Sequence, residues 1–214
     1  MKVTNISVQA KNPDRVNISV DGKYRLSLDF YQLADLGVRV GVEYDEQALR
    51  ELETASQFGK LYGRALEYCL MRPHSAREVR DYLYRKTLPR RYKSRTGEIK
   101  EAEGVAKHIA EDTFNRLVER GYVNDENFAR FWVENRNQTK GTSLRKLRAE
   151  LRAKGVDSSI IESAMSGGER DDKTELEKII AKKQARYPDQ QKLMQYLSRQ
   201  GFGYDDIKNA LTQD

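Results

Sequence analysis

The spacing of apolar residues changes along the chain, from a strand-like period near the N-terminus to a helical period after about residue 58. Between residues 2 and 28 apolar and polar residues alternate, which is typical of half-buried strands. Asp21-Gly22 separates two of these runs by two residues, as in a type I′ hairpin. We therefore expect a small antiparallel sheet, then short helices at about residues 30–36 and 45–56, then longer helical segments.

One pattern occurs three times in the helical part of the chain. It consists of a helix-capping residue, apolar residues four and eight positions later, and a further apolar residue at position 13. The copies are Ser75/Val79/Leu83/Leu88, Ser143/Leu147/Leu151/Val156 and Asp189/Leu193/Leu197/Phe202, with Lys86, Lys154 and Gln200 at position 11. The same spacing from cap to core predicts the same three-helix repeat each time.

These patterns predict a mainly α chain in which three tandem three-helix repeats follow a small antiparallel β/α module. We expect the module at residues 1–57, repeat 1 at 58–124, repeat 2 at 125–166 and repeat 3 at 169–214. Repeat 1 carries an insertion at about residues 87–107 that is rich in Arg and Lys. We expect this insertion to be a mobile basic loop or an extension of the helices into solvent.

The composition favours small helical repeats with a large basic surface. Apolar residues make up 38% of the chain and charged residues 34%, so a single large core is not expected. The formal net charge is +6, and the basic residues concentrate in the middle of the chain, where residues 58–124 hold 15 Lys and Arg against 9 Asp and Glu. Such clustering is typical of proteins that bind a polyanion or an acidic protein groove.

Basic residues also gather on one face of the repeated helix. Positions 2, 5 and 9 after the cap share a face away from the apolar stripe, and in repeat 2 all three are arginine. Because no acidic residue stands near them at helical spacing, we expect this face to bind an anionic partner through the guanidinium donors. The candidate binding residues are Arg77, Arg80, Arg145, Arg148 and Arg152, with Arg136 and Lys140 as secondary candidates.

The sequence offers little that could support catalysis. Its two histidines, His74 and His108, are far apart and have no ligand-type neighbours at metal-binding spacing. A glycine-rich phosphate-binding loop is missing, and Cys69 is the only cysteine. We expect no enzyme activity, no cofactor and no metal site, with His74 exposed in a turn and Cys69 buried. A lone cysteine, without a signal peptide or a membrane-length apolar run, favours a cytoplasmic protein.

Several motifs resemble the RecX family, the regulators of the RecA recombinase. They are Leu70-x-Arg72-Pro73-x-Ser75-x-x-Glu78-Val79, Gly121-Tyr122-Val123-Asn124-Asp125-x-x-Phe128-Ala129 with Arg136 and Lys140-Gly141, Glu150-Leu151-x-x-Lys154-Gly155-Val156 with Ile160, and Tyr196-Leu197-x-x-Gln200-Gly201-Phe202-x-x-Asp205-Asp206-Ile207-x-x-Ala210-Leu211. The resemblance covers about residues 60–212, and the order and spacing of the motifs make it specific. The chain departs from the family pattern in the insertion after Leu88 and in Gln200, which stands in place of Lys.

The resemblance implies three tandem three-helix repeats in an elongated, curved array, with the N-terminal hairpin of the longer family members. It also implies a non-enzymatic partner of the RecA–DNA filament that modulates, most often by inhibition, RecA ATPase and strand exchange in DNA repair, recombination and the SOS response. The expected partners are the RecA filament and the phosphates of single-stranded or duplex DNA, and we expect a monomer that does not bind membranes. Whether DNA or RecA receives the arginines stays open.

The alternative is a sequence-specific DNA-binding regulator built from homeodomain-like or helix-turn-helix units. Such proteins place their base-contacting residues on the last helix of the unit. In repeat 2 that helix begins with the acidic and apolar run Asp157-Ser158-Ser159-Ile160-Ile161-Glu162, which argues against insertion into a major groove.

Overall fold

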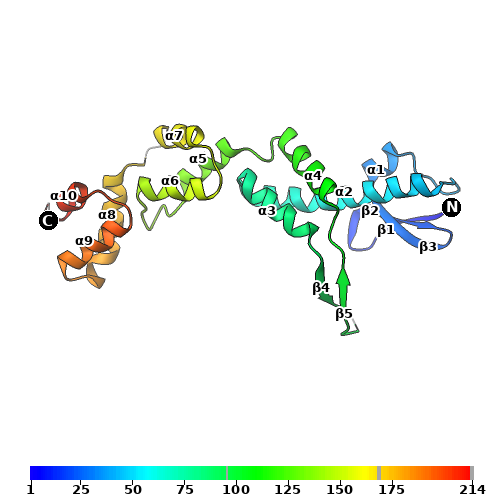
Figure 1. The fold of residues 1–214 in the computed structure, drawn as a ribbon, viewed down its shortest axis with the longest axis horizontal. Helices are drawn as coiled ribbons and strands as arrows, with labels where there is room; N and C mark the ends of the chain where they lie inside the picture. Colours follow the sequence, from blue (N-terminus) through cyan, green and yellow to red (C-terminus); the bar gives the residue numbers. More distant parts are fainter. Residues whose placement is uncertain (95, 168–169, 213–214) are drawn as a thin grey trace. The chain divides into compact units, whose positions relative to one another are not determined.

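The computed structural model describes residues 1–94, 96–167 and 170–212. The chain divides into two compact bodies, drawn in Figure 1. We call residues 1–71 with 80–122 the N-terminal body, and residues 72–79 with 123–214 the C-terminal body. Arg95 of the basic insertion and the boundary between repeats 2 and 3 at 168–169 lie outside the described residues.

The N-terminal body begins with the expected antiparallel sheet. Its strands β1 (Val3–Gln9), β2 (Asn12–Val20) and β3 (Lys23–Asp29) lie in the order β1-β2-β3. Ile18 in the central strand pairs with Ile6 on one side and Leu26 on the other. Asp21 and Gly22 have φ values of 48° and 77°, the left-handed backbone that a type I′ turn requires. The predicted hairpin is confirmed.

The helices after the sheet differ from expectation in one boundary. Helix α1 (Phe30–Asp35) begins at Asp29, which forms a capping box with Gln32. Helix α2 (Glu46–Met71) continues past Ser56, so the predicted end of this helix is wrong. Gly59 does not stop the helix; it leaves room for the Gln32 amide, which donates to the carbonyl of Ala55 at 2.6 Å. The first part of α2 packs on the sheet and the second part belongs to repeat 1.

Repeat 1 combines the end of α2 with α3 (Ala76–Thr87) and α4 (Lys107–Glu119). We expected the insertion between α3 and α4 to be a loop or an extension of the helices, and this expectation is wrong. The insertion is an antiparallel hairpin of β4 (Arg90–Lys93) and β5 (Ile99–Ala102), which extends away from α3 and α4 in Figure 1. Because the chain enters this hairpin after Thr87, Leu88 stays 43% exposed instead of joining the core.

The C-terminal body contains repeats 2 and 3. Repeat 2 consists of α5 (Asp125–Asn135), α6 (Leu144–Ala153) and α7 (Ser158–Ser166). Repeat 3 consists of α8 (Asp172–Lys183), a 3₁₀ turn η1 (Gln184–Arg186), α9 (Gln190–Arg199) and α10 (Tyr204–Thr212). The predicted apolar positions of both repeats are buried, namely Leu147, Leu151, Val156, Leu193, Leu197 and Phe202. The sequence pattern therefore located these cores correctly.

Candidate partner-binding surface

The cap of the repeated helix joins each repeat to the next one. Ser75 accepts a hydrogen bond from the backbone N–H of Glu78 and donates its own hydroxyl to the carbonyl of Lys154 at 2.9 Å. Ser143 makes the same two contacts one repeat later: it accepts from the backbone N–H of Lys146, and its hydroxyl donates to the carbonyl of Gln200 at 2.7 Å. Both serines are fully buried. The start of one repeated helix thus lies against the end of the next repeated helix, and we call this contact the junction.

A second hydrogen bond recurs at each junction. The backbone N–H of Ala76 donates to the carboxylate of Asp125 at 2.8 Å, and the N–H of Leu144 donates to the carboxylate of Asp172 at 2.7 Å. An acid from the first helix of one repeat therefore satisfies a free N–H of the preceding repeat. Burial raises the pKa of Asp172. Asp171, the preceding residue, accepts from the N–H of Thr174 and is the cap of α8 itself.

The third junction contact joins position 3 of one repeat to position 11 of the next. Between repeats 1 and 2 the carboxylate of Glu78 forms an ion pair with Lys154. Between repeats 2 and 3 the ammonium of Lys146 donates to the side-chain oxygen of Gln200 at 2.9 Å. Glutamate at position 3 is replaced by lysine in repeat 2, so a lysine at position 200 would face Lys146. The structure thereby gives a physical reason for Gln200.

Glu78 also gathers two other side chains around it. The Arg72 guanidinium lies 3.2 Å from its carboxylate, and Nδ1 of His74 lies 3.1 Å from the same oxygen. Burial alone raises the pKa of Glu78, but hydrogen bonds from Lys154 and Arg72 outweigh burial and hold the pKa at about 2. The expectation that His74 is exposed is wrong, since only 5% of the residue is accessible. The Glu78 carboxylate gives the buried His74 ring a hydrogen-bond partner.

A buried glutamate fixes the junction between repeats 2 and 3. Glu175 is 1% exposed and accepts hydrogen bonds from the N–H of Thr142 at 2.8 Å, from Arg170 at 3.0 Å and from Lys178 at 2.7 Å. Burial alone raises the pKa of Glu175, yet these donors bring it below its usual value. Gly141, with φ of 77°, lies so close that a Cβ atom would be 2.5 Å from the Glu175 carbonyl oxygen. The loop before α6 is therefore held firmly on α8.

The structure pairs three of the predicted arginines with carboxylates. Their ion pairs are Arg80–Glu111 at 3.4 Å, Arg136–Glu150 at 2.8 Å and Arg148–Glu162 at 3.0 Å. The inference that the arginine row of repeat 2 lacks acidic partners is therefore wrong for Arg148. Two of the carboxylates come from the third helix of the same repeat, α4 or α7, where spacing along one helix could not reveal them. Arg80 in addition lies 3.7 Å from the centre of the Phe114 ring.

Arg77 takes part in the junction between repeats 1 and 2. Its guanidinium donates to the carbonyl of Ala153 at 3.3 Å, and its side chain covers Gly155, where a Cβ atom would be 3.0 Å from the Arg77 Cδ. Gly155 has φ of 79°, so it both ends α6 and leaves space for this arginine. A structural role thus accounts for part of the Arg77 side chain, although the residue as a whole remains exposed.

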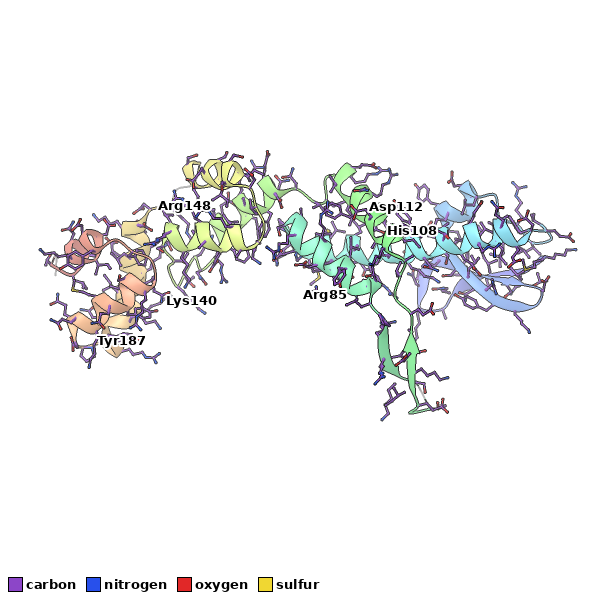
Figure 2. All side chains as sticks on the ribbon, in the orientation of Figure 1. Arg85, His108, Asp112, Lys140, Arg148 and Tyr187 are labelled. Atoms are coloured by element: carbon purple, nitrogen blue, oxygen red, sulfur yellow. The ribbon has the colours of Figure 1, made fainter. Side chains whose placement is uncertain are left out.

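Arg145, Arg152 and Lys140 remain as exposed cations for which the described residues provide no carboxylate partner. Arg145 and Arg152 are seven residues apart on α6 and therefore lie on the same face of the helix. Lys140 belongs to the loop that Glu175 holds, next to α6 in Figure 2. These three residues form the candidate partner-binding surface. Among the described residues no group of metal-ligating side chains is present.

The fold and this surface define a class of protein: three-helix repeats with a recurring polar junction at the cap of the repeated helix, and with exposed cations on that helix. Family models identify the class further. They match "Regulatory protein RecX N-terminal domain" at residues 1–45, "RecX, second three-helix domain" at 124–165 and "RecX, third three-helix domain" at 173–211. The chain belongs to the RecX family of regulatory proteins.

Curated relatives and solved structures agree with this assignment. The chain is 30% identical over 218 residues to "Regulatory protein RecX" of Bacillus subtilis (strain 168), covering 99% of this chain and 76% of the relative. It is 31% identical to the protein of that name from Bacillus licheniformis, with the same coverage. A crystal structure of a regulatory protein RecX superposes with a TM-score of 0.69 at 23% identity over 97% of both chains. RecX from Lactobacillus salivarius gives 0.55 at 23% identity, over 74% of this chain and 97% of that one.

The fold comparison confirms the mainly helical class with an N-terminal antiparallel sheet. No helix in the described part of the chain is both long and apolar enough to cross a membrane.

Proposed function

We propose that this chain is a non-enzymatic, cytoplasmic regulator that binds the RecA–DNA filament and inhibits RecA ATPase and strand exchange. Its membership of a family of regulatory proteins supports this role. The observation that carries the proposal is that Arg145 and Arg152 on α6 are exposed and have no carboxylate partner in the described chain. The repeat that bears them is held by a junction at each end. A surface that is already fixed loses little entropy when it binds.

The junctions explain how such a chain could act on a filament. Repeat 2 is bound to the segment 72–79 by Ser75 and Glu78, and to repeat 3 by Ser143 and Glu175. Repeats 2 and 3, fixed to each other in this way, can contact neighbouring subunits of a filament at a constant spacing. Arginine suits either phosphate or carboxylate because its planar fork donates two parallel hydrogen bonds. Bridging subunits would hold the filament in one conformation and slow ATP turnover.

The observed contacts do not favour the alternative of a sequence-specific DNA reader. In repeat 2 the helix that such a reader would insert is α7, and Glu162 of α7 forms an ion pair with Arg148. Ile161, Ala164 and Met165 of α7 are buried in the repeat core. What remains exposed on this helix is Glu162 and serines, so α7 offers no cation to phosphate.

The test is the ATPase activity of RecA on single-stranded DNA at increasing concentrations of the purified chain. We expect Arg145→Ala/Arg152→Ala to need about tenfold more protein for half-maximal inhibition, which corresponds to about 1.4 kcal/mol of lost binding. Arg186→Ala/Arg199→Ala removes the same charge from repeat 3 and should leave inhibition within about twofold. Equal inhibition by the wild type and the α6 variant would contradict the assignment of these arginines, and a chain that never affects the ATPase would contradict the function.

A further inference from the structure

The β4–β5 hairpin is firmly anchored where it leaves the N-terminal body. The backbone N–H of Val105, on the returning segment, donates to the carbonyl of Lys86 at 2.9 Å. Gly104 passes so close to the end of α3 that any Cβ atom there would overlap with the carbonyl of Thr87. Only glycine fits this crossing. The foot of the hairpin is therefore fixed against α3, although the strands themselves are exposed.

A basic hollow lies at this foot. It has a volume of about 370 Å³ and is lined by α2, the end of α3, the start of β4 and the segment around Gly104. The cationic side chains that line it are Lys60, Arg64, Arg85, Lys86 and Arg90, and Glu103 is its one acidic lining residue. Figure 2 labels Arg85 at the end of α3, just above the hairpin.

These cations are not neutralised by the described part of the chain. None of the five forms an ion pair there, whereas the neighbouring Arg91 is paired with Glu101 at 2.7 Å. Lys86 makes a cation–π contact, with its ammonium 4.7 Å from the centre of the Tyr82 ring. Five positive charges around one hollow repel each other, and an anion bound among them removes that repulsion.

One face of the hairpin continues the basic surface. In the antiparallel register Tyr92 is opposite Lys100 and Arg90 is opposite Ala102, so these four residues share a face. The other face holds the Arg91–Glu101 ion pair together with Lys93 and Ile99. Tyr92 is 46% exposed and lies between Arg90 and Lys100. Lys100 has Glu98 at 3.7 Å, an ion pair between two exposed side chains that stabilises little.

We propose that the hollow and the Tyr92 face together bind single-stranded nucleic acid. The phosphates lie among the cations of the hollow, and an unpaired base stacks on the ring of Tyr92. A basic groove beside an exposed aromatic ring is the arrangement by which proteins bind single strands without sequence preference. An acidic protein could pair with the cations and pack on the ring, but a single strand brings a phosphate and a stacking base together in every nucleotide. The bases of a duplex, being paired and stacked, are not available to the ring.

This site is separate from Arg145 and Arg152, which belong to the C-terminal body. It gives the chain a contact with nucleic acid that does not depend on RecA. Its failure and the failure of the proposed function are therefore distinguishable, because the binding experiment contains no RecA and the ATPase experiment measures RecA itself.

The experiment is a fluorescence-anisotropy titration of the full-length chain into a labelled oligothymidylate, repeated at several salt concentrations. We expect Arg64→Ala/Arg85→Ala to weaken binding at least tenfold and to reduce the slope of log K against log salt by about 1.4, since each phosphate contact on a single strand contributes about 0.7. Arg116→Ala/Arg120→Ala, which removes equal charge from α4 and its end, should change affinity less than threefold. Circular dichroism spectra of all variants should coincide.

Tyr92 separates nucleic acid from other anions. Tyr92→Ala should weaken oligothymidylate binding about fivefold or more without changing the salt slope, and Tyr92→Phe should restore it because stacking needs only the ring. Polyglutamate of equal charge should compete poorly. If polyglutamate competes as well as the oligonucleotide, or if a duplex of equal length binds more tightly, the ligand assignment is wrong. Unchanged affinity of the Arg64/Arg85 variant would eliminate the site.

Discussion

Replacing Glu78 by Gln removes the negative charge at the junction between repeats 1 and 2 while keeping the size of the side chain. In the wild type the carboxylate is paired with Lys154 and with Arg72, whose guanidinium lies 3.2 Å away. The Glu78 side chain is 16% exposed and that of Lys154 is 26% exposed, so solvent only partly screens the pair. The variant leaves two cations close together without their counter-charge.

The size of the effect follows from the pKa of Glu78. Folding lowers this pKa from its usual 4.5 to about 2. At 1.36 kcal/mol for each pKa unit, the ionised carboxylate contributes about 3 kcal/mol at neutral pH. A group with a lowered folded-state pKa contributes fully above its unfolded-state value, so this stabilisation is present above about pH 4.5 and declines as the pH falls towards 2. We expect Glu78→Gln to lose about 2–3 kcal/mol at pH 7, because the amide keeps part of the hydrogen bonding.

Urea unfolding followed by tryptophan fluorescence measures this loss in the right part of the molecule. Trp132 is the only tryptophan in the chain, and the Lys154 ammonium lies 4.6 Å from the centre of its ring. Its emission therefore reports the C-terminal body. The difference in the free energy of unfolding between wild type and variant should be largest at pH 7 and should decrease as the pH is lowered through 4.

Glu162→Gln is the matched control for this experiment. It removes an ion pair from the same body, but the side chains of Arg148 and Glu162 are 35% and 55% exposed, and we expect a loss below about 1 kcal/mol. If Glu78→Gln destabilises no more than this control, or if its effect is the same at pH 7 and pH 3, the electrostatic account of the junction is incorrect.

Two further predictions concern the junction between repeats 2 and 3, both measured by thermal unfolding. Gly141→Ala should lower the free energy of unfolding by about 3 kcal/mol, because the new Cβ atom would lie 2.5 Å from a backbone oxygen. Gly155 has nearly the same φ, but only the Arg77 side chain is in the way of a Cβ atom there. Gly155→Ala should therefore lower the free energy of unfolding by only about 1–2 kcal/mol. Similar losses would show that the close packing at Gly141 is unimportant. Gln200→Lys should destabilise by about 0.5–1 kcal/mol through repulsion of Lys146, and Gln200→Glu should stabilise by a similar amount; the reverse order would refute the pairing of positions 3 and 11.

The repeats could be predicted from the sequence because their signals are local. A capping serine and apolar residues four and eight positions later fall within one helix, and Ser143, Leu147 and Leu151 are buried as this spacing predicts. The hairpin at 90–102 was missed because its pattern is formed mostly by charged residues. The apolar residues there are Tyr92, Ile99 and the small Ala102, and the two large ones are exposed. A strand pair without a buried face leaves no alternation of apolar residues to detect.

The candidate binding surface was predicted only in part, and for a different reason. Whether an arginine is free depends on carboxylates from other helices, and Glu111 and Glu162 lie 31 and 14 residues away from Arg80 and Arg148. Spacing along one helix gives no information about such partners. The buried position of His74 likewise follows from Glu78 and its surroundings, not from its place before a helix cap.

The junctions change how differences between the repeats should be interpreted. Viewed alone, Gln200 indicates that repeat 3 has lost a positive charge used for binding. The structure shows instead that position 11 faces position 3 of the preceding repeat, so the change at 200 accompanies the change from Glu78 to Lys146. Charges at these two positions are therefore governed by the stacking of the repeats. On α6 the exposed cations without a carboxylate partner in the described chain are Arg145 and Arg152. Arg145 also lies beside Gly201 at the junction, as Arg77 lies beside Gly155, so Arg152 is the cation of this pair that no junction contact involves.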